Sequence, residues 1–180
     1  LDVLSRMAAG AYTAVVAPVA AACQLTMPPA ELLGRTRTVK VGDDVPPGEL
    51  VQALVAAGYV RYDQVDGTSQ FALRGGILDI FPPGRTEPVR LEFWGDTIES
   101  MTAFDLATQR RTEALNSLRI TPSAEVLFAD AEKTAKAIEA LAAGLRGKAT
   151  KAREKLLTDA DTLRKTGTLP CKDKYLPLVY

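Results

Sequence analysis

Apolar and polar residues alternate most regularly between positions 88 and 94. The apolar side chains of this run are Val89, Leu91 and Phe93, and those on the opposite side are Arg90, Glu92 and Trp94. A period of two predicts a half-buried β-strand. Gly95-Asp96 then predicts a two-residue type II′ turn, because glycine at the first central position allows a positive φ. We expect a second strand over residues 97–104.

If Trp94 and Thr97 flank the turn, the register of this hairpin follows. It pairs Phe93 with Ile98 and Leu91 with Ser100 on the buried side, and Glu92 with Glu99 and Arg90 with Met101 on the outer side. Trp94 then shares a face with Arg90. Either a further layer such as a helix covers this indole, or it is an exposed anchor, since Trp and Arg are enriched at interface hot spots.

The preceding stretch, residues 70–80, predicts a second pair of strands. Phe71 and Leu73 alternate with polar or small residues, so Arg74 points away from the buried side. Gly75-Gly76 allows a bulge or a sharp bend. With that bulge Asp79 falls on the outer side, where it needs no buried partner.

Other elements follow from shorter patterns. The apolar run 12–17 predicts a buried parallel strand, Pro18 the start of a helix over 19–24, and Arg37 to Val41 a further strand. A helix over 48–57 buries Leu50 and Leu54 against the sheet and stops at Gly58. We expect short strands over 108–112 and 116–121, a helix capped by Asp130 that ends before Gly147, and a solvated helix over 148–166.

One family carries the long central motif of this chain. The run from Tyr59 to Arg111 closely resembles the UvrA-binding module shared by the excision-repair protein UvrB and the transcription-repair coupling factors. The resemblance is carried by Phe71-Ala-Leu-Arg-Gly-Gly-Ile-Leu-Asp-Ile-Phe-Pro82 and Pro88-Val-Arg-Leu-Glu-Phe-Trp-Gly-Asp96. Two features favour the coupling-factor (Mfd) family over UvrB. They are Thr108-Gln-Arg110, which follows Phe104-Asp105, and the C-terminal segments 167–170 and 175–180.

The resemblance implies a non-catalytic docking surface for UvrA. Position by position, the contacts in that family correspond to Arg74, Arg90 and Trp94. The tryptophan is a departure, because relatives commonly have phenylalanine there. We expect the two arginines to pair with carboxylates on UvrA, with Trp94 buried between them. The resemblance also implies that the parent protein contacts RNA polymerase and double-stranded DNA, and that its ATP- and Mg-dependent translocase motor follows residue 180.

Composition narrows the chemistry. The 180 residues include 22 basic and 22 acidic ones, so no net charge draws the chain to nucleic acid or to a membrane. Histidine is absent, which removes the commonest general base and metal ligand. Cys23 and Cys171 have no metal or redox spacing, and we interpret them as cytosolic thiols. No phosphate loop or membrane-spanning run occurs, so we expect no cofactor in this chain and a cytoplasmic location within a larger protein.

The predicted fold class is α/β (α+β), with a small, mostly antiparallel sheet and packed helices. The domains we expect are the end of a degenerate helicase-like α/β subdomain over 1–34, a UvrA-binding domain over 35–117, and a helical return to that subdomain over 118–180. The predicted function is a protein-interaction segment that recruits UvrA to stalled RNA polymerase. Two alternatives stay open: part of a UvrB-type ATP-dependent DNA-damage-recognition enzyme, or a spacer, which a covered Trp94 would favour.

Overall fold

A computed structural model describes residues 1–145 and 149–180. The chain divides into two compact units. The first, called here the sheet unit, comprises residues 1–17 and 28–124, and the second, the helical unit, comprises residues 18–27 and 125–180. The α/β class predicted from the sequence is confirmed, because helices and a mainly antiparallel sheet coexist. The three predicted domain boundaries stay a prediction.

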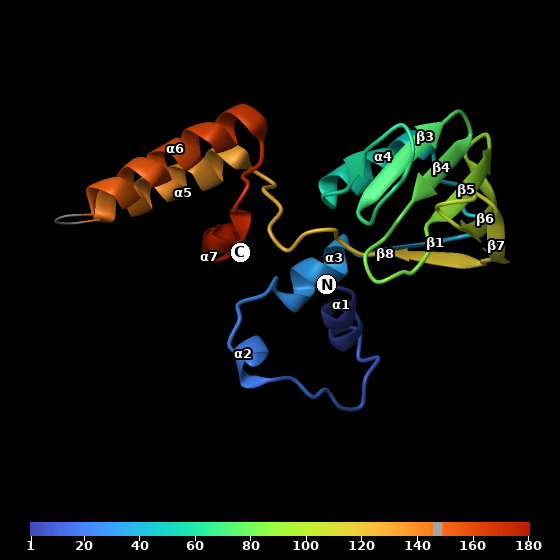
Figure 1. Ribbon diagram of the computed structural model, residues 1–180, viewed down its shortest axis with the longest axis horizontal. Helices are drawn as coiled ribbons and strands as arrows, with labels where there is room; N and C mark the ends of the chain where they lie inside the picture. Colours follow the sequence, from blue (N-terminus) through green and yellow to red (C-terminus); the bar gives the residue numbers. More distant parts are fainter. Residues whose placement is uncertain (146–148) are drawn as a thin grey trace. The chain divides into compact units, whose positions relative to one another are not determined.

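The sheet unit is built on six strands in the order β2-β3-β4-β5-β6-β7. Strands β3 to β7 can be followed in Figure 1. All neighbours are antiparallel except β2 and β3, which run parallel. The strands are β2 Val60–Arg61, β3 Gln70–Arg74, β4 Ile77–Ile80, β5 Val89–Trp94, β6 Thr97–Phe104 and β7 Arg111–Ala114. Two-residue turns join β3 to β4 and β5 to β6, whereas longer segments, 62–69, 81–88 and 105–110, join the other consecutive strands.

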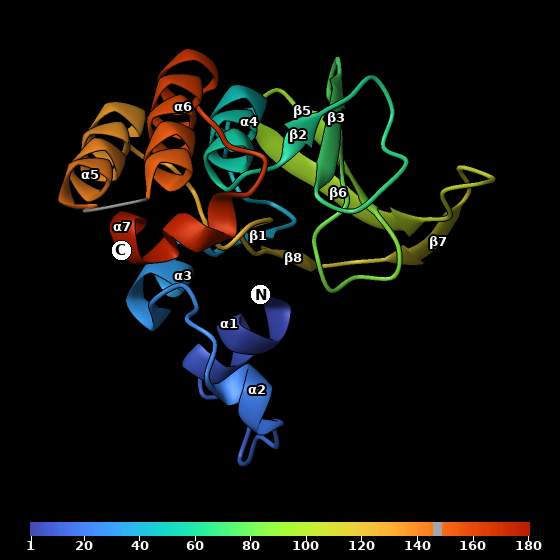
Figure 2. The same ribbon diagram turned by 60° about the vertical axis from the view of Figure 1, so that its left-hand side comes forward.

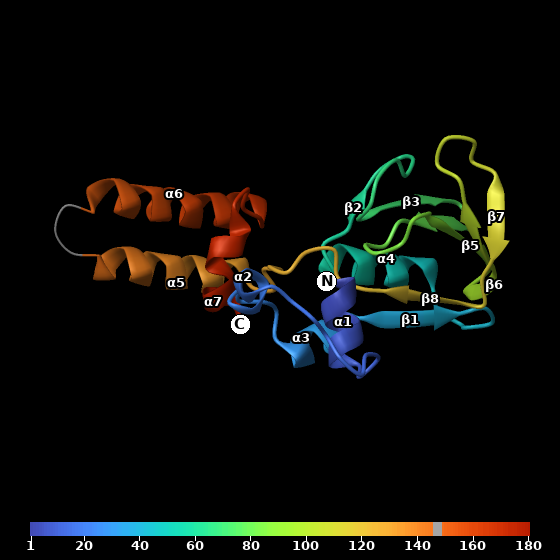
Figure 3. The ribbon, with the colours of Figure 1, turned by 60° about the horizontal axis from the view of Figure 1, so that its bottom comes forward.

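Helix α4 (Pro47–Ala56) covers one face of this sheet. On its other side lies an antiparallel ribbon of β1 (Arg37–Lys40) and β8 (Ser117–Ile120), so the helix is sandwiched between two β-layers (Figure 3). Leu50 and Leu54 are buried in the resulting core, which confirms the predicted helix and its packing. Each such leucine contributes about 1.5–3 kcal/mol through burial.

The turn of the β5–β6 hairpin agrees with the prediction. Gly95 has a φ of 62°, as a type II′ turn requires, and Trp94 pairs with Thr97 and Phe93 with Ile98. Beyond that point the predicted register is wrong by one residue. The observed pairs are Glu92 with Ser100, Leu91 with Met101 and Arg90 with Thr102.

A β-bulge between Glu92 and Phe93 causes this shift, because Glu99 is left without a cross-strand partner. The extra residue lets Met101 turn into the core beside Leu91, where both are fully buried. It also leaves Ser100 on the outer side, where its hydroxyl donates to Glu92 Oε2 at 2.6 Å. The bulge therefore brings a large apolar side chain inward without displacing the turn.

Gly75-Gly76 forms a tight turn between β3 and β4, which is the sharp bend and not the bulge of the two predicted alternatives. Gly75 has a φ of 60°, and Arg74 pairs directly with Ile77 across the turn. Gly76 also approaches β5 closely: its carbonyl accepts from Phe93 N at 2.8 Å, and a Cβ here would lie 3.0 Å from Phe93 O. The faces of β3 and β4 were nevertheless predicted correctly. A two-residue turn places Arg74 opposite Ile77, so Arg74 and Asp79 lie on the same face of the sheet.

Two sequence predictions fail in the connecting segments. Residues 12–17 form no strand, because no described strand lies beside this run to pair with its backbone groups. Val16 in this run is almost fully exposed. The strand predicted over 108–112 starts only at Arg111. Before it, Asp105 Oδ1 accepts from Thr108 N and Oγ1, both at 2.7 Å, and holds residues 105–110 in a loop.

Two helices complete the sheet unit at its N-terminal side. Helix α1 (Asp2–Ala8) contacts α3 (Pro29–Arg35). Arg119 of β8 fixes α1, because its Nη2 donates to Ser5 Oγ at 2.6 Å. Ser5 is fully buried, so this bond gives a partner to a hydroxyl that would otherwise be unpaired in the core.

The helical unit is organised by the antiparallel pair α5 (Ala131–Gly144) and α6 (Thr150–Thr166), which lie side by side (Figure 2). Asp130 caps α5 as predicted, accepting from Lys133 N at 2.8 Å. Apolar packing joins the pair through Ala135, Ile138, Ala160 and Leu163. Leu141, although apolar, is exposed. The predicted helix boundaries at Gly147 and Lys148 lie outside the described residues.

The rest of the helical unit consists of short elements. They are α2 (Val19–Ala22), a 3₁₀ turn (Lys172–Tyr175) and α7 (Leu176–Val179). Pro18 precedes α2 as predicted, but the helix is only one turn long. Tyr175 inserts into the α5–α6 core, and its hydroxyl donates to Asp159 Oδ2 at 2.7 Å.

Candidate partner-binding face

The sheet has an inner face, which packs on α4, and an opposite outer face, which carries the predicted site. Cross-strand partners point to the same side, so the register defines the outer face. Its members on strands β3, β4 and β5 are Ala72, Arg74, Ile77, Asp79, Arg90, Glu92 and, by alternation along β5, Trp94. The three predicted residues, Arg74, Arg90 and Trp94, therefore emerge from one face of one sheet.

Asp79 joins the two arginines. Its Oδ1 accepts from Arg90 Nε at 2.7 Å, and its Oδ2 accepts from Arg90 Nη2 at 2.9 Å and from Arg74 Nη2 at 2.6 Å. The Asp79 side chain is 1% exposed, against 16% for Arg90 and 45% for Arg74. A buried carboxylate is thus covered by two guanidinium groups, of which that of Arg90 is largely buried and that of Arg74 is half-exposed.

Arg90 is held from two further directions. Its guanidinium carbon lies 4.6 Å above the centroid of the Phe104 ring, and its Nη2 lies 3.3 Å from Gln109 Oε1. The hydrogen bond to Asp79 raises the pKa of Arg90 above its ordinary value. Arg90 is consequently a permanent cation with a fixed orientation.

The loop that supplies Gln109 is itself ordered by hydrogen bonds. Gln109 Nε2 donates to Leu106 O at 2.9 Å, and Gln109 adopts a φ of 58°, unusual for a residue with a side chain. The bonds from Thr108 lower the pKa of Asp105 below its ordinary value. The 105–110 loop is thus a built support beside Arg90.

Arg74 is the more accessible of the two arginines. Besides its bond to Asp79, its Nη1 donates to Asp63 O at 3.2 Å, which ties it to the segment after β2. Nearly half of its side chain faces solvent. Arg74 can therefore meet a partner while it keeps both of its contacts within the chain.

Trp94 stands at the turn end of β5 and is 80% exposed. This exposure contradicts the covered alternative and removes the observation that would have favoured a spacer, while the anchor role stays a prediction. Trp94 is four residues from Arg90 along the strand, a spacing of about 13 Å. Trp94 therefore lies beside the arginine pair. The sequence-based expectation that it lies between the two arginines is not met in this chain.

Sequence reasoning missed the partner of the arginines. Asp79 was placed on the correct face but was expected to be solvated, whereas it is buried beneath Arg74 and Arg90. The available signal was the Gly75-Gly76 turn: a two-residue turn places Asp79 on the same side as Arg74, and the next antiparallel strand brings Arg90 opposite it.

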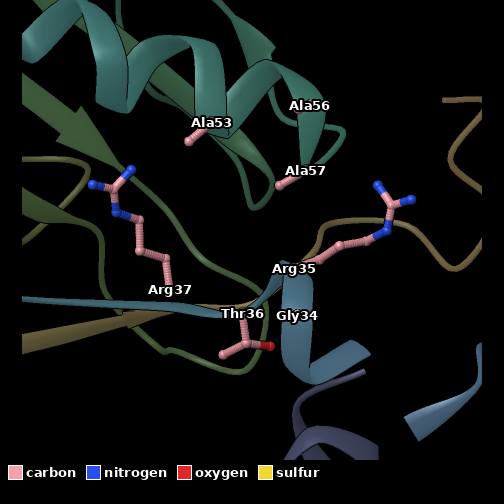
Figure 4. A pocket seen from close by; sticks show the side chains of 7 residues that line it. All are labelled: Gly34, Arg35, Thr36, Arg37, Ala53, Ala56 and Ala57. Atoms are coloured by element: carbon pink, nitrogen blue, oxygen red, sulfur yellow. The ribbon is translucent and has the colours of Figure 1, made fainter. Parts of the chain in front are cut away.

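A hollow of about 340 Å³ occurs elsewhere in the sheet unit, lined by residues 34–37 and by Ala53, Ala56 and Ala57 (Figure 4). The side chains of Arg35 and Arg37 point away from one another and bind Glu31 and Glu49 respectively. Besides these two arginines, the lining offers the Thr36 hydroxyl, backbone and methyl groups, but no acid–base pair. We assign no function to this hollow.

Metal and membrane chemistry receive no support from the described residues. In the ranges 1–145 and 149–180, no cluster of three potential ligands could hold a metal ion. Every helix in those ranges is too short or too polar to cross a bilayer. Cys23 and Cys171 are both exposed free thiols.

The comparison with protein families identifies the sheet unit. Residues 38–125 match the family model of the UvrB interaction domain, a range that includes every residue of the outer-face cluster. This part of the chain is therefore similar to the UvrB interaction domain family.

The relatives are more specific, and they confirm the resemblance predicted from the sequence. The chain is similar to the transcription-repair-coupling factors of Bacillus subtilis strain 168 (38% identity over 146 residues, 81% of this chain) and Escherichia coli K12 (34% over 111 residues, 62%). It is 51% identical to that of Mycobacterium bovis over 73 residues, 41% of this chain. The matched regions are 12%, 10% and 6% of the respective relatives, so the chain spans only a small part of their length.

Proposed function

We propose that this chain is a non-catalytic docking module that binds UvrA through the outer face of its sheet, and so recruits UvrA during transcription-coupled nucleotide excision repair. The family match and the coupling-factor relatives support this role. In the proposal, RNA polymerase, double-stranded DNA and ATP with Mg bind to other parts of the parent protein, and this chain holds no cofactor. Its location is cytoplasmic.

One observation carries the proposal: Trp94 is 80% exposed on the face that presents Arg74 and Arg90. An exposed indole does not stabilise a solvated sheet face, whereas an indole buried at an interface contributes strongly to binding affinity. The neighbouring guanidinium edges fit a partner that offers carboxylates, because arginine binds them with a fixed fork geometry. The competing UvrB-type enzyme is less favoured, since the relatives reported above are coupling factors.

The direct test is a calorimetric titration of UvrA into this chain and into Trp94→Ala. Loss of a hot-spot aromatic weakens binding by about 30-fold or more. Tyr12→Ala is the matched control, because Tyr12 is an exposed aromatic outside residues 38–125. The proposal fails if Trp94→Ala binds UvrA as tightly as the unchanged chain does.

Arg74→Ala is the second informative variant, since Arg74 is half-exposed and can be removed with Arg90 still on Asp79. We expect binding about tenfold weaker or more. Arg90→Ala is a poor first test, because it also removes both hydrogen bonds that Arg90 donates to the buried Asp79 carboxylate. A loss of binding in that variant would not separate contact from folding.

A further inference from the structure

We propose that Asp79 is a positioning residue for the docking face: it holds Arg74 and Arg90 in one fixed arrangement and thereby determines the affinity for UvrA without touching UvrA. This inference rests on the docking function proposed above. It goes further by assigning a role to a carboxylate that no partner can reach, since its side chain is 1% exposed.

The geometry shows how one carboxylate orders two cations. Arg90 engages both oxygens of Asp79 through Nε and Nη2, which fixes the plane of its guanidinium. Arg74 reaches Oδ2 from the neighbouring side of the sheet through Nη2. Two guanidinium groups this close would repel one another without the negative charge between them.

Secondary contacts complete the arrangement. Phe104 and Gln109 hold Arg90, and the carbonyl of Asp63 holds Arg74. A free arginine samples many rotamers and loses that freedom on binding, which weakens affinity. Because these contacts order both side chains before the partner arrives, little freedom is left to lose.

Asp79→Asn separates positioning from simple charge, because the two make opposite predictions. The substitution raises the net charge of the face by one unit. If charge alone mattered, an acidic partner would bind more tightly. If Asp79 positions the arginines, the loss of the charged fork releases them, and UvrA binds about tenfold more weakly or worse.

The experiment measures UvrA affinity for Asp79→Asn and for Asp66→Asn, an exposed control that makes the same change in charge. Nuclear magnetic resonance of the arginine Nε–H groups supplies a second readout. In the unchanged chain the Arg90 Nε–H is bonded to Asp79 and should exchange slowly with water. In Asp79→Asn we expect faster exchange together with weaker binding, while Asp66→Asn changes neither.

Arg74→Lys keeps the proposal testable if Asp79→Asn does not fold. Lysine preserves the charge but lacks the planar fork that bridges Asp79 and the Asp63 carbonyl. We expect this variant to bind UvrA almost as weakly as Arg74→Ala does. Affinity equal to that of the unchanged chain would overturn the positioning role.

The outcomes distinguish the two proposals. If Trp94→Ala and Arg74→Ala weaken binding but a folded Asp79→Asn binds as Asp66→Asn does, or more tightly, only the positioning role is wrong. If the unchanged chain does not bind UvrA at all, the docking function is wrong, and the positioning role falls with it.

Discussion

The two units of this chain each contain an arginine–carboxylate cluster, and the two clusters have opposite composition. On the sheet, one carboxylate, Asp79, is shared by two arginines. In the helical unit, one arginine, Arg164, is shared by two carboxylates: it donates to Glu132 at 2.8 Å and to Glu139 at 2.5 Å, and so links α5 with α6. The distances are alike, but the surroundings are not.

Burial separates the two clusters. Asp79 is 1% exposed, whereas the three side chains of the Arg164 cluster are 32% to 54% exposed. Hydrogen bonds to Glu139 and then Glu132 raise the pKa of Arg164, yet water and salt screen these exposed charges, so the shift is no measure of stability. Short distances alone thus do not identify an ion pair that matters for folding.

The largest expected effect is that of Arg90→Met. It leaves a buried carboxylate with Arg74 alone, and we expect the free energy of unfolding to fall by about 3–5 kcal/mol. Urea denaturation measures this fall. Arg111→Met is the matched control on the same face, because Arg111 forms a more exposed ion pair with Glu92, and its effect should stay within about 1 kcal/mol.

A second variant isolates the cause of that fall. Arg90→Met combined with Asp79→Leu replaces the buried pair by apolar side chains, and most of the lost stability should return. If the double variant is as unstable as Arg90→Met alone, lost packing of Arg90 on Phe104 explains the effect, and the charge of Asp79 does not.

Asp130→Ala should have the next largest effect, although Asp130 is exposed. Its carboxylate accepts from Lys133 N at the first turn of α5, where backbone donors have no partner within the helix. We expect about 1 kcal/mol of lost stability, measured by chemical denaturation. Asp130→Asn, which retains a capping oxygen, should stay close to the unchanged chain. Equal losses in both variants would contradict the capping role.

The faces of the sheet were predictable because alternation is local. Arg74 and Trp94 can be assigned to the outer side from a few neighbouring residues and a two-residue turn, with no knowledge of the partner strand. The start of α4 within one residue and the Asp130 cap of α5 were predictable for the same reason, since caps and first turns have local signals.

What could not be predicted depends on the neighbouring strand. The bulge at Glu99 exists because Met101 gains more by burial than Ser100 would, a choice that only the assembled core can decide. The run 12–17 is apolar, but composition cannot supply the adjacent strand that it would need. Asp79 is buried only because pairing brings Arg90, eleven residues away, across it.

Arg164→Met should have a smaller effect than either substitution above. It removes both links between α5 and α6, but the apolar contacts of Ile138 and Leu163 remain. We expect the melting temperature, followed by circular dichroism at a helix wavelength, to fall by no more than about 2 °C. A fall comparable to that of Arg90→Met would show that exposure does not distinguish the two clusters.

The smallest effect is a dependence of stability on pH that comes from the two glutamates of this cluster. The hydrogen bonds from Arg164 lower the pKa of Glu132 and of Glu139 below the ordinary value of 4.5. A lowered carboxylate pKa means that the native state holds the charged form, so the contribution is fully present above pH 4.5 and is lost as the pH falls through the lowered values. In Arg164→Met this loss should be absent, and the melting temperatures of the two chains should converge as the medium becomes more acidic. If the difference between them instead stays constant from pH 7 down to the acid transition, Arg164 stabilises the helix pair through the packing of its aliphatic stem and not through its charge.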